Sequence, residues 1–150
     1  MKIDLNQTYN MNNFISRSGR FTTSEFQQAV SNLLNNYKEY AINKGDYLIT
    51  TTKSIEIINN EQILDVEILL PVLEHISVLE PYIYKEHIHI TNALYTIVSD
   101  LTKLTDTINE VNQYISENRL QAITHPYLVQ TKQNNDIQIE IYIGLNPNII

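Results

Sequence analysis

The chain of 150 residues has no cysteine and no tryptophan, and it has only 3 glycines and 4 prolines. Without cysteine, disulfide bonds, thiolate metal sites and thiol nucleophiles are all excluded. With so few glycines there is no glycine-rich loop for nucleotide phosphates, and no Gly-x-Ser-x-Gly nucleophile elbow occurs. We therefore expect no cofactor, no catalytic residues and no enzymatic activity.

Positive charge is also scarce, because 10 Lys+Arg stand against 17 Asp+Glu and the formal net charge is -7. The resulting negative electrostatic field repels phosphate backbones and anionic membrane surfaces, whereas it attracts basic partners and small cations. No apolar run approaches the roughly 20 residues that cross a bilayer, and the N-terminus lacks the apolar core of a signal peptide. We expect a cytoplasmic protein that binds neither nucleic acid nor membrane.

An internal repeat is the main positive feature of the sequence. At an offset of 80 positions, His89–Leu94 resembles Tyr9–Phe14, and Tyr127-Leu128-Val129 resembles Tyr47-Leu48-Ile49. Since a chain of this length forms one sizeable core, the repeat predicts a single domain, residues 1–150. We expect it to consist of two half-repeats, at about 9–72 and 82–145, joined by a connector at 71–81.

Each half-repeat predicts the order β-α-β-β. Thr22 and Glu25 have the spacing of a capping box, and the apolar period that follows predicts a helix from about Thr23 to Asn43, stopped by Gly45. Gly19 is expected to form a turn before this helix. The other expected elements are strands at 13–17, 47–52, 63–70 and 88–98, a helix at 103–117, and a closing hairpin of 122–130 and 137–143.

This order predicts an α+β fold, a duplicated β-α-β-β module. Two amphipathic helices need one sheet to cover, so we expect both on one face of a curved antiparallel sheet. The other face would form a groove. Each closing strand carries one acid within an apolar run, Glu67 in the first copy and Glu140 in the second, and both are expected to point toward the groove.

The double β-α-β-β plan with a glutamate in each closing strand resembles the gyrase-inhibitor-like (GyrI-like) domains, which also serve as effector-binding halves of drug-sensing transcription regulators. In that family the glutamate of the last strand lies in a tyrosine-lined pocket and meets cationic ligands. The matching residue here is Glu140, and Glu67 is its counterpart. Gly144 stands where the family often has proline, and no helix-turn-helix precedes the domain, so we do not expect this chain alone to control transcription.

A second resemblance involves Tyr9-Asn10-Met11, Phe14–Arg17, the Val66-Glu67 strand and residues 88–100. These segments are similar to an uncharacterised family of small proteins encoded in Gram-positive bacteria beside type VII secretion genes and their toxins. This resemblance implies an accessory factor or chaperone that binds a secreted toxin or a secretion component. The groove would then be a protein-docking surface.

The candidate groove residues, for a ligand or a partner, are Glu67, Glu140, Tyr95, Tyr127 and Tyr142. The alternative is ordinary structure, since acids line the wet side of half-exposed strands and tyrosine rings pack in cores and interfaces. His87 and His89 share a strand face, but two histidines without a third ligand do not predict a metal site.

Three hypotheses follow. The first is a non-enzymatic chaperone or accessory factor for a type VII substrate, and the second is a GyrI-like sensor or sequestering protein for a cationic small molecule. The third is a small hydrolase with Glu140 and either Tyr142 or Tyr95 as a general-base pair, to which we object that Tyr142 is expected to point away from Glu140. The apolar segments Tyr82-Ile83-Tyr84 and Pro147–Ile150 favour a homodimer or a heterocomplex. The sequence does not identify the ligand or the partner.

Overall fold

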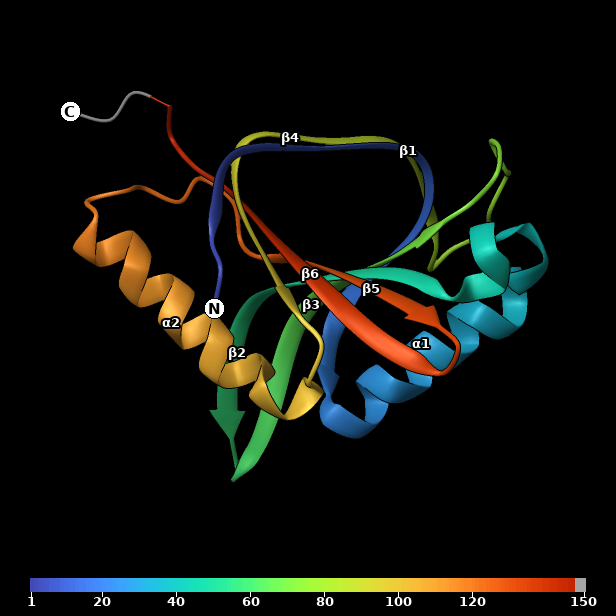
Figure 1. Ribbon diagram of the computed structural model, residues 1–150. Helices are drawn as coiled ribbons and strands as arrows, with labels where there is room; N and C mark the ends of the chain where they lie inside the picture. The colour runs from blue at the N-terminus through green and yellow to red at the C-terminus, as the bar shows by residue number, and fades with distance from the viewer. Residues whose placement is uncertain (148–150) are drawn as a thin grey trace. The chain divides into compact units, whose positions relative to one another are not determined.

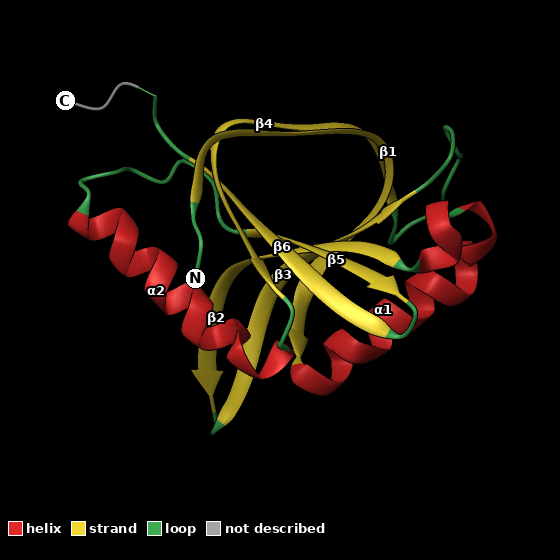
Figure 2. Cartoon of the chain, viewed as in Figure 1, coloured by secondary structure: helices red, strands yellow, loops and turns green. Residues whose placement is uncertain are grey.

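The computed structural model describes residues 1–147, and its elements follow the order β-α-β-β twice (Figures 1 and 2). This confirms the α+β class and the predicted order. The first copy contains β1 (Asp4–Thr22), α1 (Thr23–Tyr37), β2 (Tyr47–Ile58) and β3 (Glu61–Pro71). The second contains β4 (Ile83–Val98), α2 (Leu104–Glu117), β5 (Tyr127–Gln133) and β6 (Asp136–Gly144).

The chain divides into two compact units, each named here by its central glutamate. The Glu67 unit is Met11–Ile88, and the Glu140 unit is Met1–Asn10 together with the chain from His89 onward. The chain therefore passes from one unit to the other within β1 and again within β4. The early part of β1 belongs to the Glu140 unit, whereas the early part of β4 belongs to the Glu67 unit.

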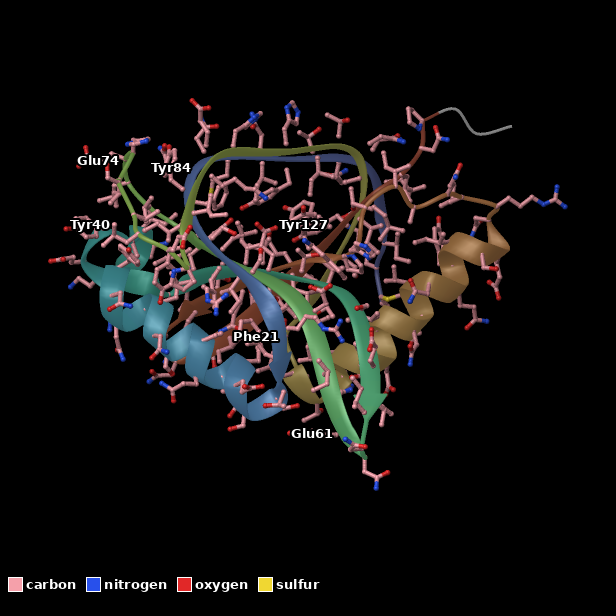
Figure 3. All side chains as sticks on the ribbon, turned by 180° about the vertical axis from the view of Figure 1, so that it is seen from behind. Phe21, Tyr40, Glu61, Glu74, Tyr84 and Tyr127 are labelled. Carbon is pink, nitrogen blue, oxygen red and sulfur yellow. The ribbon has the colours of Figure 1, made fainter. Side chains whose placement is uncertain are left out.

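Each unit contains an antiparallel sheet with the same strand order. In the Glu67 unit β3 lies between β1 and β2, and in the Glu140 unit β6 lies between β4 and β5. Both closing hairpins turn through two asparagines with positive φ, Asn59-Asn60 and Asn134-Asn135. Figure 3 labels Glu61, the first residue after the turn of the β2–β3 hairpin. The closing strand, with its glutamate, is thus the middle strand of each sheet.

One face of each sheet packs against the helix of its own unit. Leu33 of α1 is fully buried in a core with residues of β1 and β3, namely Ile15, Val66, Ile68 and Leu70. Val111 of α2 is likewise buried with residues of β4 and β6, namely Leu94, Ile139, Ile141 and Ile143. Because successive strand residues point to opposite faces, Glu67 and Glu140 lie on the face turned away from the helix of their unit.

Helix α1 begins as predicted and ends earlier. Thr22 Oγ1 accepts from the Glu25 amide at 3.1 Å, and a Glu25 carboxylate oxygen accepts from the Thr22 amide at 2.9 Å, so the capping box is confirmed. The prediction that the helix reaches Asn43 is wrong, because α1 ends at Tyr37 and two short 3-10 turns follow. Ala41 takes an extended conformation and bridges to Val72, which interrupts the helix.

The predicted turn at Gly19 is also wrong. Gly19 continues β1 and pairs with Val66. A Cβ atom at this position would lie 2.6 Å from Cζ of Phe21, so the missing side chain makes room for the phenylalanine ring. The glycine therefore serves packing within a strand.

The connector after β3 crosses the surface, as predicted, although Ile76 and Val78 pack against the core of the Glu67 unit. Tyr82 lies before β4 and not on a strand, and its ring meets that of Tyr37 at 5.1 Å. Only Ile83 of the segment Tyr82-Ile83-Tyr84 is strongly exposed, at 66%. Most of the expected apolar tail, residues 148–150, lies outside the described residues. Among residues 1–147 no helix is long and apolar enough to span a bilayer.

Candidate functional site

Backbone geometry shows which residues of the two units correspond. Asn13 and Asn92 both have a positive φ, of 71° and 49°. Their carbonyl oxygens accept from the amides of Val72 and Leu145 respectively. Asn92 therefore corresponds to Asn13 and not to Asn12, so the constant offset assumed from the sequence is wrong by one residue in this strand.

The residue pairing between the strands also makes the two glutamates equivalent. Glu67 pairs with Ser18 on β1, and Glu140 pairs with Ile97 on β4. Ser18 and Ile97 stand at the same distance along the chain from Asn13 and Asn92. The two glutamates therefore occupy corresponding positions in the middle strand of their units, as the sequence predicted.

In the Glu140 unit this carboxylate belongs to a tyrosine cluster. The Tyr142 hydroxyl donates to Glu140 Oε2 at 3.2 Å. The Tyr142 ring lies 5.0 Å from that of Tyr95 and 4.9 Å from that of Tyr9, centroid to centroid, with both pairs tilted. Tyr127 stands opposite Tyr142 in the β5–β6 ladder and is labelled in Figure 3. We call these four tyrosines and Glu140 the tyrosine cage.

This geometry corrects the expectation that Tyr142 points away from Glu140. Residues two apart on a strand share a face, and the hydrogen bond between the two side chains shows that they do so here. The objection to a Glu140–Tyr142 general-base pair therefore falls, although hydrolysis itself stays untested.

The tyrosine cage is partly open and negatively charged. Glu140, Tyr95, Tyr127 and Tyr142 are half-buried, and Tyr9 is buried. Burial raises the pKa of the Tyr95 hydroxyl, and the negative charges of Glu140 and Asp4 and a hydrogen bond to Glu140 raise it further. Among residues 1–147 no lysine, arginine or histidine forms an ion pair with Glu140. The cage thus presents a carboxylate and aromatic rings without a cation of its own.

The equivalent place in the Glu67 unit is closed. Glu67 is only 7% exposed, and its Oε2 accepts from Ser16 Oγ at 2.6 Å and from Lys85 Nζ at 2.9 Å. Lys85 comes from the early part of β4, which belongs to this unit. The chain therefore neutralises this glutamate itself.

The aromatic rings distinguish the two units. The cross-strand pair Tyr95–Tyr142 corresponds to Ser16–Leu69, because each pair lies at the same place in its ladder. Tyr127 faces Tyr142 as Ile49 faces Leu69, so Tyr127 corresponds to Ile49 and not to Tyr47. Only the Glu140 unit therefore surrounds its glutamate with tyrosines at these positions.

Sequence reasoning missed two residues. Tyr9 was not predicted to lie beside Glu140, because it belongs to the half-repeat opposite to the one in which it packs. Lys85 was not considered as a partner of Glu67, although the two side chains form an ion pair. Both were missed because the chain passes between units within its leading strands, which the linear order of half-repeats does not indicate.

A pH titration checks the electrostatics of the cage. We expect Tyr95 to lose its proton above the ordinary tyrosine value of about 10, and to titrate closer to that value in Glu140→Gln. Because the folded-state pKa is raised, the stabilising contribution of this hydroxyl is complete below the unfolded pKa. It is lost as the pH rises through the folded pKa. NMR of ring-labelled tyrosine measures the shift, and an identical Tyr95 titration in both proteins would contradict the assignment.

Comparison with known proteins identifies the fold. No family model and no curated protein matches the sequence. Among solved structures, the chain is similar to EcmrR in a cryo-electron microscopy structure of an EcmrR–DNA complex, with a TM-score of 0.73 and 13% identity. That match covers 96% of this chain and 57% of the EcmrR chain. The crystal structure of the EcmrR C-terminal domain matches with a TM-score of 0.67 and 14% identity, covering 97% of this chain and 99% of the domain.

These likenesses establish the fold. The chain has the α+β architecture of the EcmrR C-terminal domain, and this is a GyrI-like fold, as the first resemblance implied. They give no support to the second resemblance, to proteins encoded beside type VII secretion genes. At these identities the match does not transfer a ligand, a partner or an activity.

Proposed function

We propose that this protein is a non-enzymatic GyrI-like binding domain for cationic small molecules, with the tyrosine cage as its binding site. The observation that carries the proposal is the unpaired charge of Glu140. This half-buried carboxylate is held by tyrosine hydroxyls and meets no cation of the described chain, whereas its equivalent Glu67 is paired with Lys85. An external cation would complete the Glu140 unit as Lys85 completes the Glu67 unit.

The chemistry of the cage favours an organic cation with apolar groups. Tyrosine faces attract cations through their π electrons, and the attraction grows when water is excluded. The Glu140 carboxylate adds a negative charge that attracts a cation more strongly than a neutral ligand. The net charge of -7 further concentrates cations near the surface. A ligand that combines positive charge with flat apolar surface therefore fits best.

A protein partner, the other class of function considered, has less support. The hypothesis of a type VII accessory factor needs a docking surface, and none of the comparisons points to secretion. Direct binding of nucleic acid by this chain is still not expected, because of its acidic charge. A dimer stays a prediction.

A thermal-shift titration with tetraphenylphosphonium tests the proposal. A ligand present at 100 times its Kd stabilises the folded protein by about 2.7 kcal/mol, so the Tm should rise with probe concentration. Triphenylphosphine oxide, which has similar rings and no charge, should leave the Tm nearly unchanged. Equal shifts with both compounds, or no shift with a panel of lipophilic cations, would refute a cation site.

A further inference from the structure

The Glu67 unit contains the second copy of the same site, and its state differs from that of the tyrosine cage. We propose that Lys85 is a tethered cation that occupies this second site and closes it. The chain would then bind one external cation and not two. The stoichiometry rests on the proposed function, whereas the closure by Lys85 rests on the Glu67 unit alone.

The contact geometry is that of a charge held in a binding site. Lys85 Nζ and Ser16 Oγ both reach Oε2 of Glu67, at 2.9 and 2.6 Å. The Glu67 side chain is 10% exposed, whereas that of Lys85 is 38% exposed. The Lys85 ammonium group can therefore rotate toward the solvent, whereas the buried Glu67 carboxylate cannot. A buried carboxylate left without a counter-charge is unfavourable, so the Lys85 ammonium stabilises the charged form of Glu67 at this place.

A second polar atom belongs to the same place. Thr51 stands directly opposite Glu67 in the β2–β3 ladder and is 3% exposed. Its Oγ1 is buried without a hydrogen-bond partner in the part of the chain that the structure describes. Buried polar atoms are nearly always paired, so an unpaired hydroxyl beside a buried carboxylate indicates capacity to bind a polar group that the chain does not supply. Lys85 neutralises the Glu67 carboxylate but does not supply a hydrogen-bond partner for Thr51 Oγ1.

The side chains around the glutamate suit a lysine stem. Ser16 and Leu69 occupy the positions that Tyr95 and Tyr142 occupy in the cage. A hydroxymethyl and an aliphatic group leave space for the apolar stem of lysine, which packs along such surface while its charge reaches a partner. Two phenol rings at these positions instead favour an organic cation with apolar groups. The closed site is thus specific for a small alkylammonium group.

Chemical rescue of Lys85→Ala tests the closure directly. This substitution removes three methylenes and the ammonium, which together correspond to n-propylammonium. We expect Lys85→Ala to lower the Tm, and n-propylammonium chloride to recover most of the loss, whereas sodium chloride at equal concentration should not. Lys53→Ala, at an exposed lysine of the same unit, should show neither the loss nor the rescue. The double variant Glu67→Gln/Lys85→Ala should show no rescue.

A folded Lys85→Ala that does not respond to n-propylammonium would overturn the proposal, as would a rescue that persists in the double variant. If Lys85→Ala does not fold, amine reactivity decides in the intact protein. Reductive methylation followed by peptide mass spectrometry should modify Lys85 several-fold more slowly than Lys53, and Glu67→Gln should remove the difference. Equal reactivity of the two lysines in the wild type would contradict the ion pair.

The two proposals fail separately. If no lipophilic cation of the panel binds but n-propylammonium rescues Lys85→Ala, the closure stands and the function proposed for the cage falls. If tetraphenylphosphonium binds at two equivalents per chain in the wild type, the closure by Lys85 falls and the cage stands.

Discussion

Glu140→Gln is expected to weaken the binding of tetraphenylphosphonium by about 10- to 100-fold. The amide keeps the size of the side chain and its ability to accept from Tyr142, but it removes the charge that an organic cation would meet. A hydrogen-bonded or paired charge in a partly desolvated place contributes about 1.5–3 kcal/mol, which corresponds to that range of Kd. Isothermal titration calorimetry measures the change.

Glu67→Gln is the matched control for this experiment. Glu67 occupies the corresponding place in the other unit and already has Lys85 as its partner. We expect the substitution to change the Kd for tetraphenylphosphonium by less than about twofold, because energetically independent sites show little coupling. If Glu67→Gln weakened binding as much as Glu140→Gln, the assignment of Glu140 to an open site and of Glu67 to a closed site would be wrong.

Leu33→Ala should be the most destabilising of the substitutions considered. Leu33 of α1 is fully buried between the helix and strands β1 and β3. Removing a buried leucine side chain costs about 2–5 kcal/mol, through lost burial and the cavity that remains. Urea denaturation followed by circular dichroism gives the free energy of unfolding.

The neighbouring residue Asn32 provides the control, since it lies on the exposed side of the same helix. Asn32→Ala should change the free energy of unfolding by no more than about 0.5 kcal/mol. A loss of less than about 1 kcal/mol for Leu33→Ala would mean that α1 does not pack on its sheet as described.

Local signals in the sequence predicted most of the fold. The capping box at Thr22 and Glu25 fixes the start of α1, because it pairs backbone groups within one turn. The closing strands were predictable from their runs of β-forming residues, which are also a local signal. The end of α1 was not, since it depends on the bridge between Ala41 and Val72, which are far apart in the sequence.

That the five predicted residues bind a ligand or a partner stays a prediction, and their arrangement in the two units was not predicted. Four of the five predicted residues, Glu140 and three tyrosines, lie in one unit, and Glu67 lies in the other. The direction of Tyr142 follows from strand alternation and should have been predicted. The contributions of Tyr9 and Lys85 depend on leading strands that serve both units, and no pattern in a single sequence indicates such an exchange.

The most direct test of the account is an NMR titration of the wild-type protein with tetraphenylphosphonium, using labelled tyrosine and lysine. We predict that the ring signals of Tyr95, Tyr127 and Tyr142 shift together and saturate at one equivalent, while the Lys85 signal stays in place. A Lys85 signal that moves while these tyrosine signals do not would contradict it, because the open cation site would then be the one that contains Glu67.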